Sequence, residues 1–154
     1  MRGTIRPVRV AVAAVLFSGA VLFIVGCGDR GPKLVKVQGK LYLNDQPVAG
    51  SDSIKGYIVF HADREKGNTT QEIAQGSVGA DGTFTLQTRD KEGAPLGWYK
   101  VTVDLADTKA DDPYYYKAKV DDKYRDYNKS GLVFEVVESP EPGRYDIKLP
   151  ARGK

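Results

Sequence analysis

The stretch Gly97-Trp98-Tyr99-Lys100-Val101-Thr102-Val103-Asp104-Leu105 decides the class of fold. Apolar side chains occupy every second position from Tyr99 to Leu105, and polar ones stand between them. Successive side chains of a β-strand point to opposite faces, so this period of two predicts a strand with one buried face. That face is expected to carry Tyr99, Val101, Val103 and Leu105.

The same kind of pattern recurs on both sides of this stretch. Apolar residues alternate over residues 34–43, with Val37, Leu41 and Leu43 on one side of a predicted strand. Residues 56–61 are rich in β-branched and aromatic side chains, which are typical of strands. Strands are expected over residues 34–43, 56–61, 74–79, 83–88, 97–105, 132–138 and 144–149.

The intervening segments have the composition of turns and loops. Asn44-Asp45-Gln46-Pro47 predicts a turn, because Asn and Asp hydrogen-bond their own backbone and Pro presets φ. Asp81-Gly82 predicts a β-hairpin that joins the strands on either side of it. Residues 62–72 are polar without a period, and residues 139–143 hold two prolines, so both are expected to be loops.

Strands at short spacing with almost no helical periodicity indicate an all-β fold, a single antiparallel β-sandwich of about seven strands. An α/β fold is not favoured. Residues 111–130 are the exception, because polar residues and tyrosines mix there without a clean period. We expect a long connection between the two sheets, with a short helical turn that opens at Asp112-Pro113.

The N-terminus has the composition of a secretory signal peptide. Three arginines, Arg2, Arg6 and Arg9, form a positive region, and residues 10–25 form an apolar one. The alternative is an uncleaved membrane anchor. The apolar run is shorter than the roughly 20 residues that span a bilayer, and no cluster of Lys and Arg follows it, so a cleaved signal peptide is favoured.

Ile24-Val25-Gly26-Cys27 resembles the lipobox of bacterial lipoproteins. In that family the thiol receives a diacylglycerol, a signal peptidase cuts before the cysteine, and the new amino terminus is acylated. The resemblance implies that Cys27 is lipidated and that Ile24, Val25 and Gly26 are read by the processing enzymes. Two or more acyl chains give stable membrane attachment, whereas one gives only marginal binding.

Cleavage before Cys27 would leave 128 of the 154 residues, which suits one domain. We expect a signal peptide at residues 1–26, the lipidated cysteine and a short polar tether at 27–33, the β-sandwich at 34–150, and a polar tail at 151–154. Gly28 follows the cysteine where the inner-membrane retention rule requires Asp. The expected location is therefore the cell envelope, at the outer membrane, facing the periplasm or the cell surface.

The net charge limits the classes of binding partner, and the cysteine count limits the covalent links within the chain. The processed chain would keep 20 of the 23 basic residues against 20 acidic ones, because only the three N-terminal arginines leave. A net charge near zero offers no basic footprint for nucleic acid. Cys27 is the only cysteine in the sequence, so an intramolecular disulfide is excluded and the fold depends on packing and backbone hydrogen bonds.

The order of the motifs resembles the transthyretin-like, carboxypeptidase regulatory-like module. It is carried by residues 37–50 with their glycine strand and Pro-Val turn, by residues 57–60, by Ala80-Asp81-Gly82-Thr83-Phe84, and by residues 95–103 with Gly-x-Tyr-x-Val-x-Val. Residues 123–136 are similar to the end of small bacterial lipoproteins built on this module. The resemblance covers most of residues 35–149 and implies a prealbumin-like Greek-key sandwich.

Catalysis and metal binding are not expected. The hydrolases of the transthyretin-like group rely on several histidines, an arginine and a C-terminal Tyr-Arg-Gly-Ser, whereas this chain has the single His61 and ends in residues 150–154 of a different sequence. A Ser-His-acid triad would have to use His61, and no Gly-x-Ser-x-Gly surrounds a serine. One histidine and one lipidated cysteine cannot make a zinc site. No cofactor is expected.

The acidic and tyrosine-rich segment between residues 104 and 127 leaves two alternatives open. Six aspartates lie there, namely Asp104, Asp107, Asp111, Asp112, Asp121 and Asp122, and interleaved lysines favour a solvated surface over a calcium site. Five tyrosines are candidate contacts for a sugar or protein, because their rings give flat apolar area with a hydroxyl: Tyr114, Tyr115, Tyr116, Tyr124 and Tyr127.

The sequence therefore predicts a membrane-tethered, non-enzymatic module that binds or scaffolds in the cell envelope. Its expected partners are the membrane, through the lipid on Cys27, and an envelope protein or glycan. The alternative is a carbohydrate-binding domain that uses the tyrosine-rich segment from Tyr114 to Tyr127.

Overall fold

The computed structural model describes residues 31–48, 51 and 53–153. Residues from Gly31 onward cluster as one compact unit. This part of the chain is all-β, as predicted, and its sheets are not closed into a barrel. The strand pairings are antiparallel except for one, in which residues 147–149 run parallel to residues 41–43. The lipobox and Cys27 lie outside the described residues.

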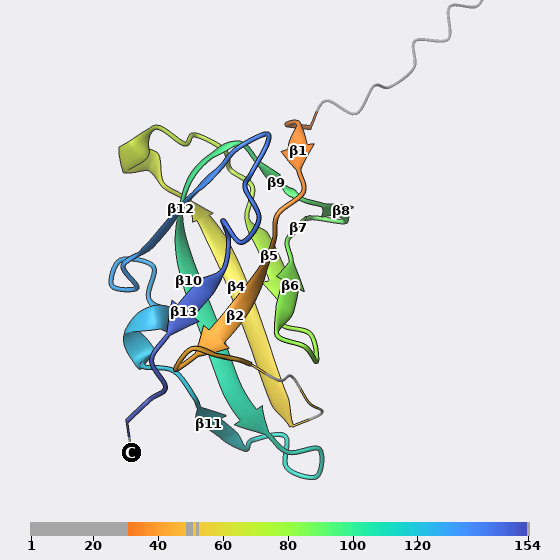
Figure 1. Ribbon diagram of the computed structural model, residues 1–154, viewed down its shortest axis with the longest axis vertical. Helices are drawn as coiled ribbons and strands as arrows, with labels where there is room; N and C mark the ends of the chain where they lie inside the picture. The colour runs from red at the N-terminus through yellow and green to blue at the C-terminus, as the bar shows by residue number, and fades with distance from the viewer. Residues whose placement is uncertain (1–30, 49–50, 52, 154) are drawn as a thin grey trace, which may run out of the picture. The chain divides into compact units, whose positions relative to one another are not determined.

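Two sheets form the layers of the fold (Figure 1). The larger sheet has the order β11-β10-β4-β5-β7-β8, with β12 also paired to β10. Its strands are β4 (Ile54–Ala62), β5 (Ala74–Ser77), β7 (Gln87–Thr88), β8 (Lys91–Glu92), β10 (Gly97–Thr108), β11 (Tyr116–Ala118) and β12 (Leu132–Val136). The smaller sheet contains β2 (Gln38–Leu43), β3 (Gln46–Pro47), β6 (Thr83–Thr85) and β13 (Ile147–Leu149).

Four further elements complete the described chain. β1 (Leu34–Val35) and β9 (Ala94–Pro95) form a separate antiparallel pair at the end of the unit where β10 begins. Two 3-10 helices, η1 (Arg64–Lys66) and η2 (Asp122–Arg125), lie in the connections. Figure 1 shows β1 at one end of β10 and β11 at the other.

The core lies between the two sheets and is made by the alternating faces that the sequence predicts. Tyr99, Val101 and Val103 are fully buried and Leu105 nearly so, while Lys100 and Asp104 on the same strand are partly exposed. The strands of both sheets and the residues next to them contribute buried side chains: Val37, Leu41, Ile58, Phe60, Phe84, Leu86, Tyr145, Ile147 and Leu149. Packing of two inner faces in this way is what defines a sandwich.

The turn at Asn44-Asp45 is confirmed as a tight hairpin. Asn44 and Asp45 have φ angles of 51° and 61°, and Leu43 pairs with Gln46 across the turn. Asn and Asp tolerate this left-handed conformation better than other non-glycine residues. The hairpin therefore follows from local chemistry, as the sequence indicates.

The hairpin expected at Asp81-Gly82 is wrong in its pairing. Gly82 has a φ of 81° and the turn forms, but β5 pairs with β4 and β7, whereas β6 pairs with β2 of the smaller sheet. The chain thus crosses from one sheet to the other at this turn. The reason is packing, because Phe84 on β6 is buried in the core.

The connection over residues 111–130 also differs from expectation. It does not cross between sheets, because β10, β11 and β12 all belong to the larger sheet. Its short helix is η2, whereas Asp112 begins only a turn, closed by a hydrogen bond from the Tyr115 amide to the Asp112 carbonyl at 3.0 Å. The segment returns along β10, so that Tyr116 lies at the edge of the larger sheet, Tyr127 contacts His61 on its outer face, and Tyr124 packs into the core.

The segment expected to be a polar tail is tied to the domain. The Ala151 amide donates to Asn44 Oδ1 at 2.9 Å, and the Arg152 amide donates to the Lys119 carbonyl at 2.8 Å. The Arg152 guanidinium also forms two hydrogen bonds of 3.1 Å to the Asp122 carboxylate. Residues 151 and 152 thus link the β2–β3 turn to η2.

Candidate functional site

Two hollows lie near the end of the unit where β10 begins, and the loop that follows β4 contributes to both. The Trp98 groove, about 650 Å³, is lined by Pro32, Lys33, residues 66–72 and residues 95–98. The His61 groove, about 520 Å³, is lined by residues 61–65, residues 70–73, Lys100, Tyr127 and Asn128. Both volumes fall in the range of small-ligand sites.

The loop between the two grooves is fixed by buried polar residues. Asp63 is 2% exposed and accepts a hydrogen bond from the Glu65 amide at 3.2 Å, which begins η1. Asn68 is 6% exposed, and its side-chain amide donates to the Trp98 carbonyl at 2.8 Å. These buried groups are satisfied, so the loop is held in one arrangement.

Trp98 precedes the buried Tyr99 at the start of β10, so its side chain points to the opposite, solvent-facing side of the strand. Its indole ring is partly exposed and lies 4.0 Å from Lys66 Nζ, measured to the ring centroid. Leu96 beside it is 40% exposed. From the sequence, Trp98 is predicted only as a residue of a strand. The sequence feature that could have singled out Trp98 as a candidate contact residue is a large apolar side chain on the polar face of an alternating strand.

The His61 groove combines an imidazole, an aromatic ring and an ion pair. His61 Nε2 lies 3.2 Å from Thr102 Oγ1, and its ring lies 5.5 Å from the Tyr127 ring. Lys100 Nζ donates to Glu65 Oε2 at 2.8 Å, and that bond raises the pKa of Lys100 and lowers the pKa of Glu65. Burial lowers the pKa of His61, because the charged imidazolium is less well solvated there.

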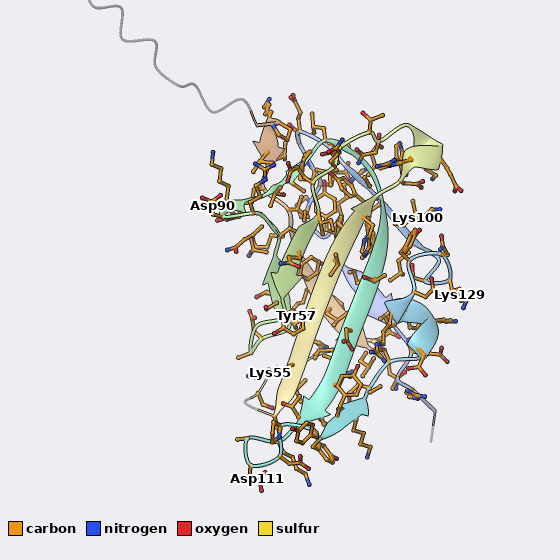
Figure 2. The ribbon with its side chains drawn as sticks, turned by 180° about the vertical axis from the view of Figure 1, so that it is seen from behind. Lys55, Tyr57, Asp90, Lys100, Asp111 and Lys129 are labelled. Carbon is orange, nitrogen blue, oxygen red and sulfur yellow. The ribbon has the colours of Figure 1, made fainter. Side chains whose placement is uncertain are left out.

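The larger sheet presents one face to solvent, and Figure 2 shows that face with Tyr57 and Lys100 labelled along it. Cross-strand register places Tyr57 beside Asp104, Val59 beside Thr102, and His61 beside Lys100. Tyr57 is 55% exposed. An antiparallel sheet commonly has one solvated face, so exposure alone does not mark a site.

The five candidate tyrosines do not form one surface. Tyr114 is 93% exposed near the far end of β10, and Tyr115 is partly exposed with Lys109 Nζ 4.2 Å from its ring centroid. Tyr124 is 7% exposed and belongs to the core cluster. Tyr127 lies with His61 in the His61 groove. Only Tyr127 therefore lines one of these two grooves.

Tyr116 is held in a charged network at the far end of β10. Its hydroxyl donates to the Asp104 carboxylate, and the Arg125 guanidinium lies 5.2 Å from its ring centroid. Arg125 also lies 3.6 Å from both Asp104 and Asp122. Partial burial and then the hydrogen bond to Asp104 raise the pKa of Tyr116 to about 12.

Three of the six aspartates of this region have basic partners. Asp104 and Asp122 pair with Arg125, and Asp107 pairs with Lys119 at 3.1 Å. Within residues 31–48, 51 and 53–153, no three His, Cys, Asp or Glu side chains come together as a metal-binding group. No helix of that same part of the chain is long and apolar enough to span a bilayer.

No protein-family model, curated protein or solved structure matches this chain.

Proposed function

We propose that this chain is a lipid-anchored, non-enzymatic module of the bacterial cell envelope that binds or scaffolds a partner there. The observation that carries the proposal is Ile24-Val25-Gly26-Cys27 after an apolar run, followed within four residues by a compact β domain that begins at Gly31. A diacylated cysteine at that position would attach the domain stably to a membrane. The transthyretin-like resemblance is compatible with such a module and stays a prediction.

The environment of the single histidine supports a non-enzymatic role. His61 contacts the Thr102 hydroxyl and the Tyr127 ring, and neither supplies the acid that orients a catalytic histidine. Glu65, a carboxylate that lines the same groove, is paired with Lys100. The proposed activity is therefore binding, with the membrane as the first partner.

Replacement of Cys27 tests the anchor. The Cys27→Ser chain should leave the membrane fraction after high-salt and alkaline washing and should lose label from a fatty-acid analogue. Gly31→Ala, which lies outside the lipobox, is the matched control and should stay in the membrane fraction with its label. Retention of Cys27→Ser with the washed envelopes would remove the proposal.

Glycan binding is the second candidate function, and the His61 groove favours it. A half-exposed ring, Tyr127, stands in a hollow that also contains the paired Lys100 and Glu65 and the polar Gln71. Flat aromatic area beside hydrogen-bonding groups suits a sugar. The proposed sugar contact is therefore one tyrosine, Tyr127, rather than the whole of residues 114–127.

A glycan array separates this candidate from simple scaffolding. If the groove binds sugar, Tyr127→Ala should lose the signal of the unchanged chain and Tyr114→Ala should keep it. Tyr124→Ala is unsuitable, because that side chain is buried. No signal from the unchanged chain, or equal signals from both variants, would exclude the groove as a glycan site.

A further inference from the structure

The position where the chain enters the domain is fixed. Leu34 pairs with Pro95 and Val35 pairs with Ala94, and Val37, two residues on, is fully buried. Gly93, which precedes β9, has a φ of 112°, and a Cβ there would lie 2.6 Å from the Val35 carbonyl oxygen. β1 is therefore held against the domain by close backbone packing.

The tether between that point and the proposed lipid is short. Four peptide steps separate Cys27 from Gly31, so their Cα atoms can be at most about 14 Å apart. The headgroup layer on each side of a bilayer is roughly 5–8 Å thick. β10, with its 12 residues, is by contrast about 36 Å long. A lipid on Cys27 would therefore keep the β1 end of the domain near the membrane surface.

The surface at this end has the chemistry of a membrane interface. The Trp98 groove is lined by Pro32 and Lys33, the second and third described residues, together with Leu96 and Trp98. Tryptophan is enriched at headgroup level because its ring is apolar and its N–H is polar. Lys66 Nζ beside the indole ring places a positive charge where anionic headgroups would accept it.

The other charges around the groove do not oppose such contact. Lys33 pairs with Glu138 at 2.6 Å, Lys36 pairs with Glu92 at 2.9 Å, and Arg89 pairs with Glu72. The two opposite charges of each pair largely cancel at distances longer than the separation between them. The carboxylates of these pairs thus add little net repulsion toward an anionic bilayer.

We propose that the Trp98 groove rests on the lipid headgroups, so that the domain stands end-on with β1 toward the bilayer and β11 away from it. This inference rests on the proposed lipidation of Cys27. The tether brings the groove to the surface, and Trp98 and Leu96 make the contact. The His61 groove and the outer face of the larger sheet then stay open to a partner.

The fluorescence of Trp98 can test this orientation, because it is the only tryptophan in the sequence. The full chain, purified with its lipid, is reconstituted in phosphatidylethanolamine and phosphatidylglycerol vesicles with or without a nitroxide on the headgroup. Trp98 should lose roughly half of its emission in the nitroxide vesicles, because one side of the ring faces the headgroups. Fatty-acid label is measured on the same sample.

A double variant, Trp98→Phe with Tyr114→Trp, is the matched control, since position 114 is 93% exposed near the other end of β10. Its emission should be the same in both kinds of vesicle. A second control inserts 20 Gly and Ser residues after Arg30, which allows a root-mean-square reach of about 25 Å. That insertion should weaken the quenching of Trp98 while the lipid label remains.

The outcomes separate the inference from the function on which it depends. An absent fatty-acid label would remove the proposed function and the inference with it. A labelled chain whose Trp98 is unquenched would overturn the end-on contact alone. Equal quenching of tryptophan at positions 98 and 114 would also overturn it, because the domain would then lie flat on the bilayer.

Discussion

The two ends of β10 are held by different kinds of interaction. At the end near β1, four rings pack in the core: Phe60 lies 5.7 Å from Tyr99 and 5.9 Å from Phe134, and Phe134 lies 6.4 Å from Tyr145. At the end near β11, Tyr116, Asp104 and their basic partners form an exposed network. In Figure 2 the end near β1 lies beyond the label of Lys100, and the end near β11 lies toward the label of Asp111.

This difference indicates which interactions contribute most to the free energy of unfolding of the domain. Burial of a Phe side chain contributes about 1.5–3 kcal/mol through the hydrophobic effect, and packing adds to it. Exposed ion pairs contribute about 0–1 kcal/mol, because water screens them and ordering long side chains costs entropy. We therefore expect substitutions of these core rings to destabilise the domain far more than substitutions in the exposed network near β11.

Phe60→Ala should give the largest loss. Phe60 is fully buried, and its removal should lower the free energy of unfolding by about 3–5 kcal/mol, because it leaves a cavity between Tyr99 and Phe134. Urea unfolding measures this. Val59→Ala, one residue away on the partly exposed face, is the control and should cost no more than about 1.5 kcal/mol. Equal losses would mean that the core is not where the structure places it.

Gly93→Ala should be the next most damaging change. The new Cβ would lie 2.6 Å from the Val35 carbonyl oxygen at a φ of 112°, so we expect a loss of roughly 2–3 kcal/mol and faster amide exchange in β1. Gly67→Ala is the matched control, because its φ is 83° but nothing lies within 4 Å of its Cβ. Equal losses in the two variants would show that β1 is not packed on β9.

Tyr116→Phe should have a smaller and pH-dependent effect. It removes one hydrogen bond to Asp104, so the loss at pH 8 should be about 1 kcal/mol. Because folding raises the pKa of Tyr116 from 10 to about 12, the contribution of its hydroxyl is present below pH 10 and is lost as the pH rises toward 12. The difference between parent and variant should therefore shrink between pH 10 and pH 12.

Tyr115→Phe is the control for that experiment, since it removes a neighbouring hydroxyl but keeps the ring beside Lys109. It should leave the free energy of unfolding at pH 8 unchanged to within about 0.5 kcal/mol. A difference between Tyr116→Phe and the parent that stays constant over the pH range would contradict the assigned hydrogen bond.

Tyr114→Ala should have the smallest effect. The ring is 93% exposed, and surface substitutions of this kind change stability by no more than about 0.5 kcal/mol. A thermal unfolding scan would detect a larger change. A loss near that of Phe60→Ala would reverse the comparison between the two ends of β10.

The strands could be predicted from the sequence wherever one face is buried. Tyr99, Val101, Val103 and Leu105 alternate with polar residues, and that period was sufficient to identify β10 and its inner face. Local chemistry likewise predicted a turn over Asn44-Asp45-Gln46-Pro47. The turn forms at Asn44 and Asp45 with positive φ angles, whereas Gln46 and Pro47 belong to β3.

Strand pairing could not be predicted in the same way. Asp81-Gly82 specifies a turn, but the partner of β6 is decided by Phe84 entering the core beside β2, which is a long-range contact. β11 was missed because its three residues are not buried and have no apolar alternation. Its position depends on pairing with β10 and on the Tyr116–Asp104 contact.

The grouping of the candidate site residues in space could not be predicted, for a related reason. Tyr114 and Tyr127 are close in sequence, but the chain between them runs back along β10, so they belong to different surfaces. The His61 groove joins residues from β4, the loop after it, β10 and the segment after η2. No short sequence pattern contains all four segments.

Mass spectrometry of the mature N-terminal peptide tests the central claim most directly. If this is a lipid-anchored envelope module, the chain recovered from washed envelopes should begin at Cys27 and carry acyl chains on its thiol and amino group. A recovered chain that still contains residues 1–26, or one with an unmodified Cys27, would contradict the claim.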